Sequence, residues 1–186
     1  MSLPFSDLEL ALLGLVRQRP QSGYDLRKTF ATSAMRHYSD SPGSIYPALR
    51  RLQNRNLIAV DESASSPAER RGRTVFAITP AGNELLVAIL RQPVTRDDVI
   101  WHAPALMLRF AFMDGNVPRA VAREFLSRFE AELALYVAEL RQNLDAMLAF
   151  APVNTGLLAF QCGIEGMEAQ LGWARRALAV LTENPR

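Results

Sequence analysis

Apolar and polar positions along the first 60 residues repeat with the period of helices, and each repeat begins at a capping residue. An apolar run from Leu8 to Val16 follows the capping-box pattern Ser6-x-x-Glu9, and a second Ser-x-x-acid pattern at Ser22 opens a helix that runs through about residue 33. A third helix begins at Ser41, because serine is a good N-cap and the proline after it fits the first helical position. The pattern therefore predicts three short helices before residue 60.

The third helix has two faces of different chemistry. Ile45, Leu49 and Leu52 recur at i, i+4 and i+7, so they share the buried face. The opposite face holds small and polar residues with arginines: Gly43, Pro47, Arg50 and Asn54, flanked by Ser44, Tyr46 and Arg51. Such a face suits phosphates and base edges, and an ordinary surface helix with solvated arginines is the alternative. The Tyr46 ring has a second, compatible interpretation, in which it packs against the second helix and leaves only its hydroxyl at the surface.

Two segments rich in β-branched residues follow the third helix. Residues 57–60 and 74–78 are predicted strands, and the polar loop between them ends in Arg70, Arg71, Gly72 and Arg73. Thr79 and Pro80 then cap a fourth helix that runs through about Leu90. The order helix, helix, helix, strand, loop, strand, helix is that of a winged helix-turn-helix, in which the third helix enters the major groove and the loop forms the wing.

A junction at Gln92, Pro93 and Thr95 divides the chain into a DNA-binding domain, residues 1–90, and a helical domain, residues 91–186. In the second part, residues 97–113 are a predicted apolar helix with a break near Pro104. A turn at 114–118 precedes a helix to about Phe150, and residues 151–155 separate it from the last helix. The predicted fold class is therefore mostly α: a winged helix-turn-helix domain with a two-stranded wing, followed by a helical, coiled-coil-like dimerisation domain.

The last helix carries an apolar stripe whose steps alternate between three and four residues. Its members are Leu157, Phe160, Ile164, Met167, Leu171, Ala174, Leu178 and Leu181. This is an a/d pattern over more than three heptads. Two long helices with such stripes can pack within one subunit, across a dimer, or both, and a dimer gains support because DNA readers of this class commonly bind paired half-sites.

Positive charge is concentrated where the third helix and the wing are expected. The net charge of the 186 residues is only +2, yet residues 17–73 hold 11 basic and five acidic residues, and residues 91–186 hold 10 basic and 11 acidic ones. This distribution is typical of a protein with a polyanionic partner, although solvated surface charge alone would give the same imbalance.

The first 90 residues resemble the PadR family of transcriptional regulators. The matching segments are, in order, Leu12-Leu-Gly-Leu, Ser22-Gly-Tyr-Asp-Leu, Ser41-Pro-Gly-Ser-Ile-Tyr-Pro-Ala-Leu-Arg-Arg-Leu, Asn56-Leu-Ile, and Arg73-Thr-Val-Phe-Ala-Ile-Thr-Pro-Ala-Gly. The resemblance implies a dimeric DNA-binding regulator, usually a repressor, whose second domain is helical. It also implies that the positions of Ser44 and Tyr46 face DNA and that wing residues reach the backbone or the minor groove.

Other chemistry finds little support in the residues. The single cysteine, Cys162, excludes internal disulfides and cysteine-cluster metal sites, and His37 and His102 lie far apart without ligand-like partners. Glycine-rich phosphate loops and nucleophile elbows are absent from the sequence. We therefore expect no cofactor, no metal and no enzymatic activity. No apolar run is long enough to span a membrane and no signal peptide is present, so a cytoplasmic protein is expected.

An aromatic cluster lies beside the junction and in the last helix: Trp101, His102, Met107, Phe110, Phe112 and Trp173. One interpretation is a pocket for a small, flat, hydrophobic effector, lined by Trp101, Met107, Phe110 and Trp173. The other interpretation is that these residues belong to the core of a dimer. The sequence leaves both open.

The sequence thus predicts a dimeric, sequence-specific transcriptional regulator that binds a pseudo-palindromic operator in double-stranded DNA. Release by a small hydrophobic effector would follow only from the pocket interpretation of the aromatic cluster. The expected DNA contacts are Ser41, Ser44, Tyr46, Arg50 and Arg51 from the third helix and Arg70, Arg71 and Arg73 from the wing. The alternative function is a winged-helix protein-interaction module that uses the same basic face for an acidic protein partner. Steep salt dependence together with sequence preference would favour the regulator.

Overall fold

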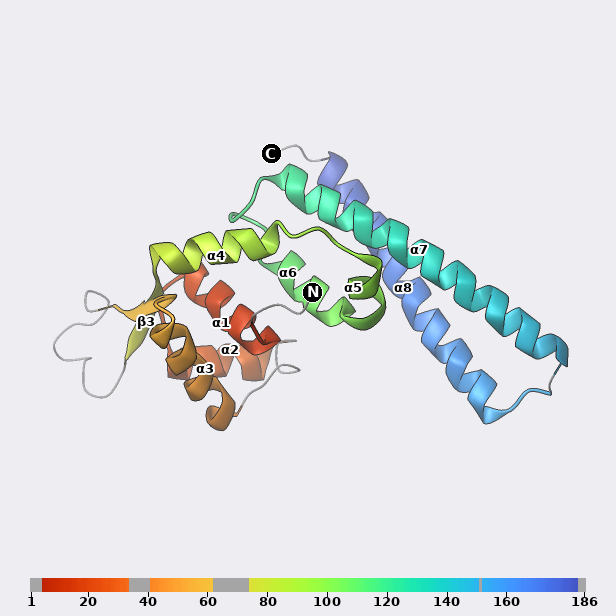
Figure 1. Cartoon of the computed structure of the whole chain (residues 1–186), viewed down its shortest axis with the longest axis horizontal. Helices are drawn as coiled ribbons and strands as arrows, with labels where there is room; N and C mark the ends of the chain where they lie inside the picture. The colour runs from red at the N-terminus through yellow and green to blue at the C-terminus, as the bar shows by residue number, and fades with distance from the viewer. Residues whose placement is uncertain (1–4, 34–40, 62–73, 151, 184–186) are drawn as a thin grey trace. The chain divides into compact units, whose positions relative to one another are not determined.

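The computed structural model describes residues 5–33, 41–61, 74–150 and 152–183. The chain divides into two compact units, Met1–Arg91 and Gln92–Arg186. The first unit holds four helices and a small sheet among its described residues, and the described part of the second unit is helical (Figure 1).

The first unit is a winged helix-turn-helix, as predicted. Its elements are α1 (Asp7–Gln18), β1 (Gln21–Ser22), α2 (Gly23–Thr32), α3 (Pro42–Asn54), β2 (Ile58–Val60), β3 (Val75–Ile78) and α4 (Pro80–Leu90). The antiparallel sheet has the order β1-β3-β2, with Ile58 opposite Ile78 and Gln21 opposite Phe76. The sheet therefore has three strands, where the sequence predicted two. A two-residue strand leaves no alternating pattern in the sequence, and it exists only because β3 pairs with it.

Capping fixes where these helices begin. In α1 the Ser6 hydroxyl accepts the Glu9 N–H at 3.3 Å while the Glu9 carboxylate accepts the Ser6 N–H at 3.1 Å. Ser22 and Asp25 form the same reciprocal pair at the start of α2. Both predicted capping boxes are confirmed, and each satisfies backbone donors that the first turn of a helix leaves free.

The apolar core of the first unit confirms the predicted buried face of α3. Ile45, Leu49 and Leu52 are at most 1% exposed. They pack in a core with fully buried side chains of the other helices, among them Leu10 and Leu13 of α1, Leu26 and Phe30 of α2, and Leu86 of α4. Each such side chain contributes about 1.5–3 kcal/mol relative to an exposed position. This burial leaves only the opposite side of α3 for a partner.

The end of α3 is anchored to α4 through a tight turn. Asn56 adopts a left-handed conformation (φ 56°), and the Leu57 N–H donates to the Leu52 carbonyl at 3.0 Å, which is the 6→1 bond of a Schellman motif. The Thr79 N–H in turn donates to the Leu57 carbonyl at 3.1 Å. The backbone of Gly82 lies so close to this turn that an added Cβ would be 2.0 Å from the Leu57 oxygen.

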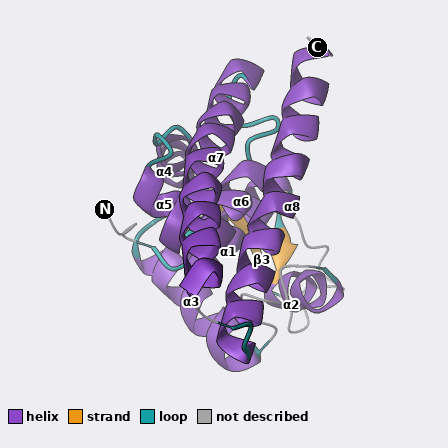
Figure 2. Cartoon of the chain, turned by 90° about the vertical axis from the view of Figure 1, so that its right-hand side faces the viewer, coloured by secondary structure: helices purple, strands orange, loops and turns teal. Residues whose placement is uncertain are grey.

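The second unit is built on a helical hairpin. Its helices are α5 (Arg96–Trp101), α6 (Ala103–Ala111), α7 (Arg119–Phe150) and α8 (Thr155–Glu183). The break expected near Pro104 lies at His102 instead, because the first turn of α6 tolerates proline. The long helices α7 and α8 run side by side in both views (Figures 1 and 2). The Arg141 guanidinium joins them by donating to both carboxylate oxygens of Glu168, at 2.7 and 2.6 Å.

The apolar stripe of α8 is only half covered within the chain. Leu157, Ile164, Leu171 and Ala174 are buried. The other four members of the stripe remain partly exposed: Phe160, Met167, Leu178 and Leu181. Intramolecular packing therefore accounts for one half of the predicted pattern.

The close approach at Gly82 generates a prediction. Gly82→Ala should lower the free energy of unfolding by about 1–3 kcal/mol, because the new methyl group collides with backbone rather than with a flexible side chain. Urea unfolding followed by circular dichroism measures the change. Gly43→Ala is the matched control, since Gly43 is exposed in α3 and an added Cβ would contact only the Ser41 hydroxyl, at 3.4 Å. If the two variants were equally stable, the proposed anchor would be wrong.

Candidate nucleic-acid interface

The exposed side of α3 brings five of the predicted site residues together. Ser41 caps the helix, Tyr46, Arg50 and Arg51 are exposed, and Ser44 is half-buried. The predicted wing residues Arg70, Arg71 and Arg73 lie outside the described residues. The candidate interface that can be described is therefore the face of α3 and the residues of α1 and α2 that border it.

The two serines at the start of α3 already serve the helix itself. The Ser41 hydroxyl accepts the Gly43 N–H at 3.2 Å, and the Ser44 hydroxyl donates to the Ser41 carbonyl at 3.0 Å. These bonds hold the first turn in place. A DNA contact through either hydroxyl stays a prediction, and it would add to this capping role.

Tyr46 packs against the beginning of α2. An added Cβ on Gly23 would be 2.6 Å from Cε1 of the Tyr46 ring, so the ring lies directly on the glycine backbone. The residue is nevertheless 45% exposed. The ring therefore packs against α2 as interpreted, but at this exposure more than its hydroxyl remains at the surface. A side chain at position 23 would displace the ring, which explains the glycine in the Ser22-Gly-Tyr segment.

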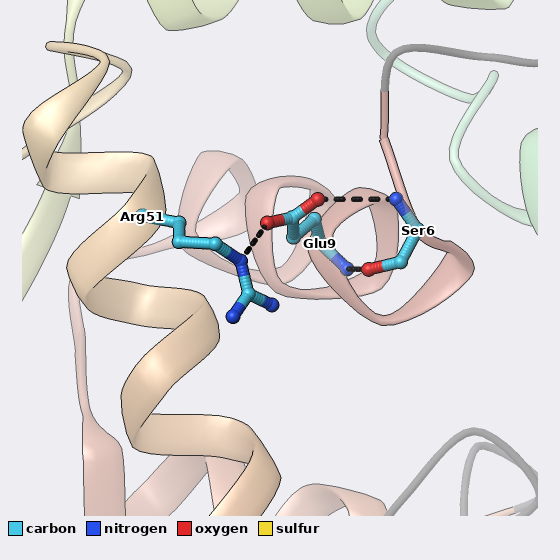
Figure 3. A network of polar contacts seen from close by, with 3 residues as sticks. All are labelled: Ser6, Glu9 and Arg51. Carbon is cyan, nitrogen blue, oxygen red and sulfur yellow. Dashed lines mark hydrogen bonds and ion pairs between the residues drawn. The ribbon is translucent and has the colours of Figure 1, made fainter.

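Arg51 of α3 is tied to α1 by an ion pair. Its Nε donates to the Glu9 Oε1 at 2.6 Å (Figure 3). The Glu9 side chain is 8% exposed and the Arg51 side chain 55%. Burial alone would raise the pKa of Glu9, but the hydrogen bonds from Arg51 and Ser6 and the charge of Arg51 outweigh it, so the pKa lies below its ordinary value. Glu9 is therefore ionised and paired at neutral pH.

Other cations of the first unit also have intramolecular contacts. The Arg55 guanidinium lies 4.0 Å from the centre of the Phe5 ring, and the Arg17 Nε donates to the Asn83 side chain at 2.7 Å. Arg50 differs, because neither an ion pair nor a hydrogen bond of its side chain is found among the described residues. Arg50 is thus the cation of α3 that is most open to a partner.

Glu9 is the residue of this region that sequence reasoning missed as a site residue. Its role in the capping box was readable from Ser6-x-x-Glu9, but the pairing with Arg51 joins positions 42 residues apart. No local pattern reports such a contact. The only sequence signal is a carboxylate at a position that the apolar run of the helix should bury.

The aromatic cluster of the second unit is only partly brought together. Phe110 stacks on Phe125 with ring centres 5.9 Å apart and meets the edge of Trp173 at 6.0 Å. Met107 is half-buried and Trp101 is 73% exposed. No ring contact of Trp101 is found within the described ranges. Phe125, which the sequence analysis did not include, therefore replaces Trp101 in the cluster.

Arg109 is a second residue whose structural role the sequence analysis missed. It is 4% exposed, lies 5.1 Å from the centre of the Phe125 ring and donates through Nη2 to the Gln92 carbonyl. Burial lowers the pKa of this guanidinium, and the Asp98 carboxylate acts in the opposite direction. A charged residue within an apolar helical segment was the signal that could have identified it.

The part of the chain that the structure describes holds no group of three His, Cys, Asp or Glu side chains placed to bind a metal ion. None of the described helices is long and apolar enough to cross a membrane.

Comparison with known proteins relates the first unit to a family. Residues 12–88 match the transcriptional regulator PadR-like family. Transcriptional regulator YqjI of Escherichia coli is 32% identical over 80 residues, which are 43% of this chain and 36% of that protein. This chain therefore spans about a third of the length of the curated relatives that it matches.

Solved structures that resemble the whole chain do so more weakly. Bacillus subtilis PadR in complex with operator DNA is 20% identical, with 95% of this chain and 99% of that chain covered and a TM-score of 0.42. The same protein in complex with p-coumaric acid has the same identity and coverage and a TM-score of 0.41. These scores are too low to establish a common arrangement of the whole chain.

Proposed function

We propose that this chain, which carries a PadR-like domain over residues 12–88, is a sequence-specific DNA-binding transcriptional regulator. The observation that carries the proposal is the exposed side of α3, which combines Tyr46 and Arg50 with the small residues Gly43 and Ser44 on a winged helix-turn-helix. An arginine without an ion pair or side-chain hydrogen bond among the described residues suits a guanine, whose O6 and N7 accept a bidentate guanidinium. The likeness of this domain to a transcriptional regulator supports the same function.

The DNA contacts divide into two kinds under this proposal. Arg50, with Tyr46 and Ser44 beside it, reads base edges in the major groove, and Ser41 lies where the helix begins. Arg70, Arg71 and Arg73 of the wing contact the DNA backbone or the minor groove. Base contacts carry sequence preference, whereas phosphate contacts carry affinity for DNA of any sequence.

We also propose that the regulator is a homodimer formed through the second unit. The half of the α8 stripe that α7 leaves uncovered is one support. A second support is the free end of the hairpin, where Phe150 is 93% exposed beside a groove of about 700 Å³ lined by Ala146, Met147, Phe150, Asn154, Gly156, Leu157 and Phe160. None of these residues is charged, and exposed apolar surface of this kind marks interaction sites. A repressor that binds a pseudo-palindromic operator as a dimer needs two α3 helices, one for each of two half-sites about 34 Å apart.

A small hydrophobic effector is a finer part of the proposal. Phe110, Phe125 and Trp173 form a connected aromatic group, with Met107 on the same helix as Phe110. Such a group suits a flat aromatic compound, and it equally suits the core of a dimer. If binding of such a compound releases the protein from DNA, the aromatic group is an effector site; if it does not, the dimer-core interpretation stands.

The alternative function, a module that binds an acidic protein, uses the same basic face. Both functions would weaken with salt, because both rest on charge. Only the regulator would distinguish one DNA sequence from a scrambled one. Selection of bound duplexes from a random-sequence library tests this directly, since an acidic-protein module would enrich no sequence.

Arg50 generates the first prediction of the proposal. Arg50→Ala should weaken binding to the selected duplex by about 1–3 kcal/mol and relax the preference at one base pair. Removing a wing arginine should instead weaken binding to all sequences alike and reduce the salt slope by about one unit. Titrations of the selected and scrambled duplexes at two salt concentrations measure both effects.

Tyr46→Phe is the matched control for packing, because it removes only the hydroxyl. If that hydroxyl donates a hydrogen bond to DNA, its loss should weaken binding by about 0.5–1.5 kcal/mol. Unchanged affinity in both Arg50→Ala and Arg51→Ala would mean that another helix enters the groove.

The dimer generates the second prediction. A fragment ending at Leu90 should sediment as a folded monomer and bind the selected duplex far more weakly than the full chain, because two linked half-sites reinforce each other. The complementary fragment, residues 92–186, should sediment as a dimer. A stable dimer of the first fragment would place the contact in the wrong unit.

The aromatic group generates the third prediction. An aromatic compound that quenches Trp173 fluorescence in a Trp101→Phe variant should also lower the affinity for the selected duplex. The substitution removes the only other tryptophan, so the signal reports on Trp173 alone. A screen in which quenching and DNA release never coincide would leave the dimer-core interpretation.

A further inference from the structure

Neighbouring arginines on α3 lie in different surroundings. Arg50 is exposed, whereas Arg51 is held by the buried carboxylate of Glu9 in α1. The distance between the Arg51 Nε and the Glu9 Oε1 is 2.6 Å. Both arginines carry the same charge, so they differ in conformational freedom: the guanidinium of Arg50 can change its orientation, and that of Arg51 is held in place.

Glu9 is itself a fixed group. Its backbone lies in the first turn of α1, and its Oε2 accepts the Ser6 N–H at 3.1 Å while its Oε1 accepts from Arg51. Both oxygens are therefore occupied, one by the capping box and one by the neighbouring helix (Figure 3). A carboxylate with 8% exposure needs such partners, because burial of an unpaired charge is costly.

Holding the guanidinium through Nε determines where its other donors point. The group is planar, so its two terminal nitrogens have a fixed direction once Nε is bonded. In Figure 3 these nitrogens point away from the Glu9 carboxylate. Within the described residues, neither of them donates a hydrogen bond. An ordered pair of donors at the surface matches the oxygens of a phosphate, which accept bidentate bonds.

We propose that Glu9 is a positioning residue for DNA binding and that it orients Arg51 toward a phosphate of the DNA backbone. This inference rests on the proposed function and adds that the two arginines of α3 divide the work. Arg50 is free to read a base, and Arg51 fixes the helix on the backbone. The pair of Glu9 and Arg51 is electrically neutral, so it adds little long-range attraction for DNA. It contributes to DNA binding by holding the Arg51 guanidinium in one orientation.

The direction in which Glu9→Gln changes the affinity for each of two duplexes distinguishes this positioning role from an effect of charge alone and from a disturbed fold. Glu9→Gln removes a negative charge beside DNA, so affinity for a scrambled duplex should stay equal or rise up to about threefold. The same substitution weakens the bond that orients Arg51. An oriented phosphate contact fixes the register in which α3 reads the bases, and only the complex with the selected duplex uses that register, so affinity for the selected duplex should fall about three- to tenfold. A change of charge alone would raise both affinities, and a disturbed fold would lower both.

The experiment is a double-substitution cycle on the full chain with the selected and scrambled duplexes as probes. Glu9→Gln, Arg51→Ala and the combination are titrated, with Asp7→Asn as the control because Asp7 lies in the same first turn without contacting Arg51. The loss of preference caused by Glu9→Gln should disappear in the Arg51→Ala background. Asp7→Asn should preserve the preference. Equal loss with and without Arg51 would overturn the proposal.

Arg51→Lys keeps the proposal testable if Glu9→Gln does not fold. Lysine retains the charge and can still pair with Glu9, but its three N–H donors share one nitrogen, so it has no planar pair of donors for bidentate binding of a phosphate. Its affinity for the selected duplex should be lower than that of the unchanged protein, with thermal stability near that of the unchanged protein. Affinity equal to that of the unchanged protein would overturn the proposal.

Failure of the proposed function would be seen in a different result. If the library enriches no sequence with the unchanged protein, the proposed function itself fails, and that result is distinct from either outcome of the Glu9 and Arg51 variants.

Discussion

The buried side of α3 is the constraint on which the rest of the first unit depends. Ile45, Ala48, Leu49 and Leu52 are at most 1% exposed, and they seat the helix against α1 and α2. Because a helix has one rotation about its axis that buries such a stripe, the opposite residues are committed to the surface. The helix also cannot slide along its axis, since the turn at Asn56 and the close approach of Gly82 fix its end. The chemistry of the exposed side is therefore presented in one orientation.

Contacts at the two edges of α3 refine that orientation. On one edge the Tyr46 ring rests on the backbone of Gly23, and on the other Arg51 binds Glu9. Each contact joins α3 to a different helix, α2 or α1. For Arg50, in the middle of the exposed side, the described part of the chain supplies neither an ion pair nor a side-chain hydrogen bond. Edge residues are thus ordered by the fold, and the central residue remains free to adapt to what it meets.

The order of elements was predictable because it rests on local rules. Serine capping boxes and the spacing of Ile45, Leu49 and Leu52 report on a few adjacent residues, and both were confirmed. The misses all depend on residues that are far apart in the chain. Strand β1 exists through pairing with β3, and the bond of Arg51 joins positions 42 apart. A sequence pattern records that a carboxylate is buried at a helix start, but it does not record which cation comes to it.

In the second unit too, a local pattern does not identify the contacting partner, because the apolar stripe of α8 fits packing within the chain and packing against a second copy equally well. The stripe of α8 predicts burial at every member, yet α7 buries only Leu157, Ile164, Leu171 and Ala174. Burial of these four side chains determines which side of α8 faces α7, so the remaining members of the stripe stay partly exposed. Uncovered apolar area at Phe160, Met167 and Leu178 costs free energy in water at roughly 25 cal/mol per Å². A second helical surface removes that cost, and a copy of the same hairpin offers one with the same spacing of apolar residues.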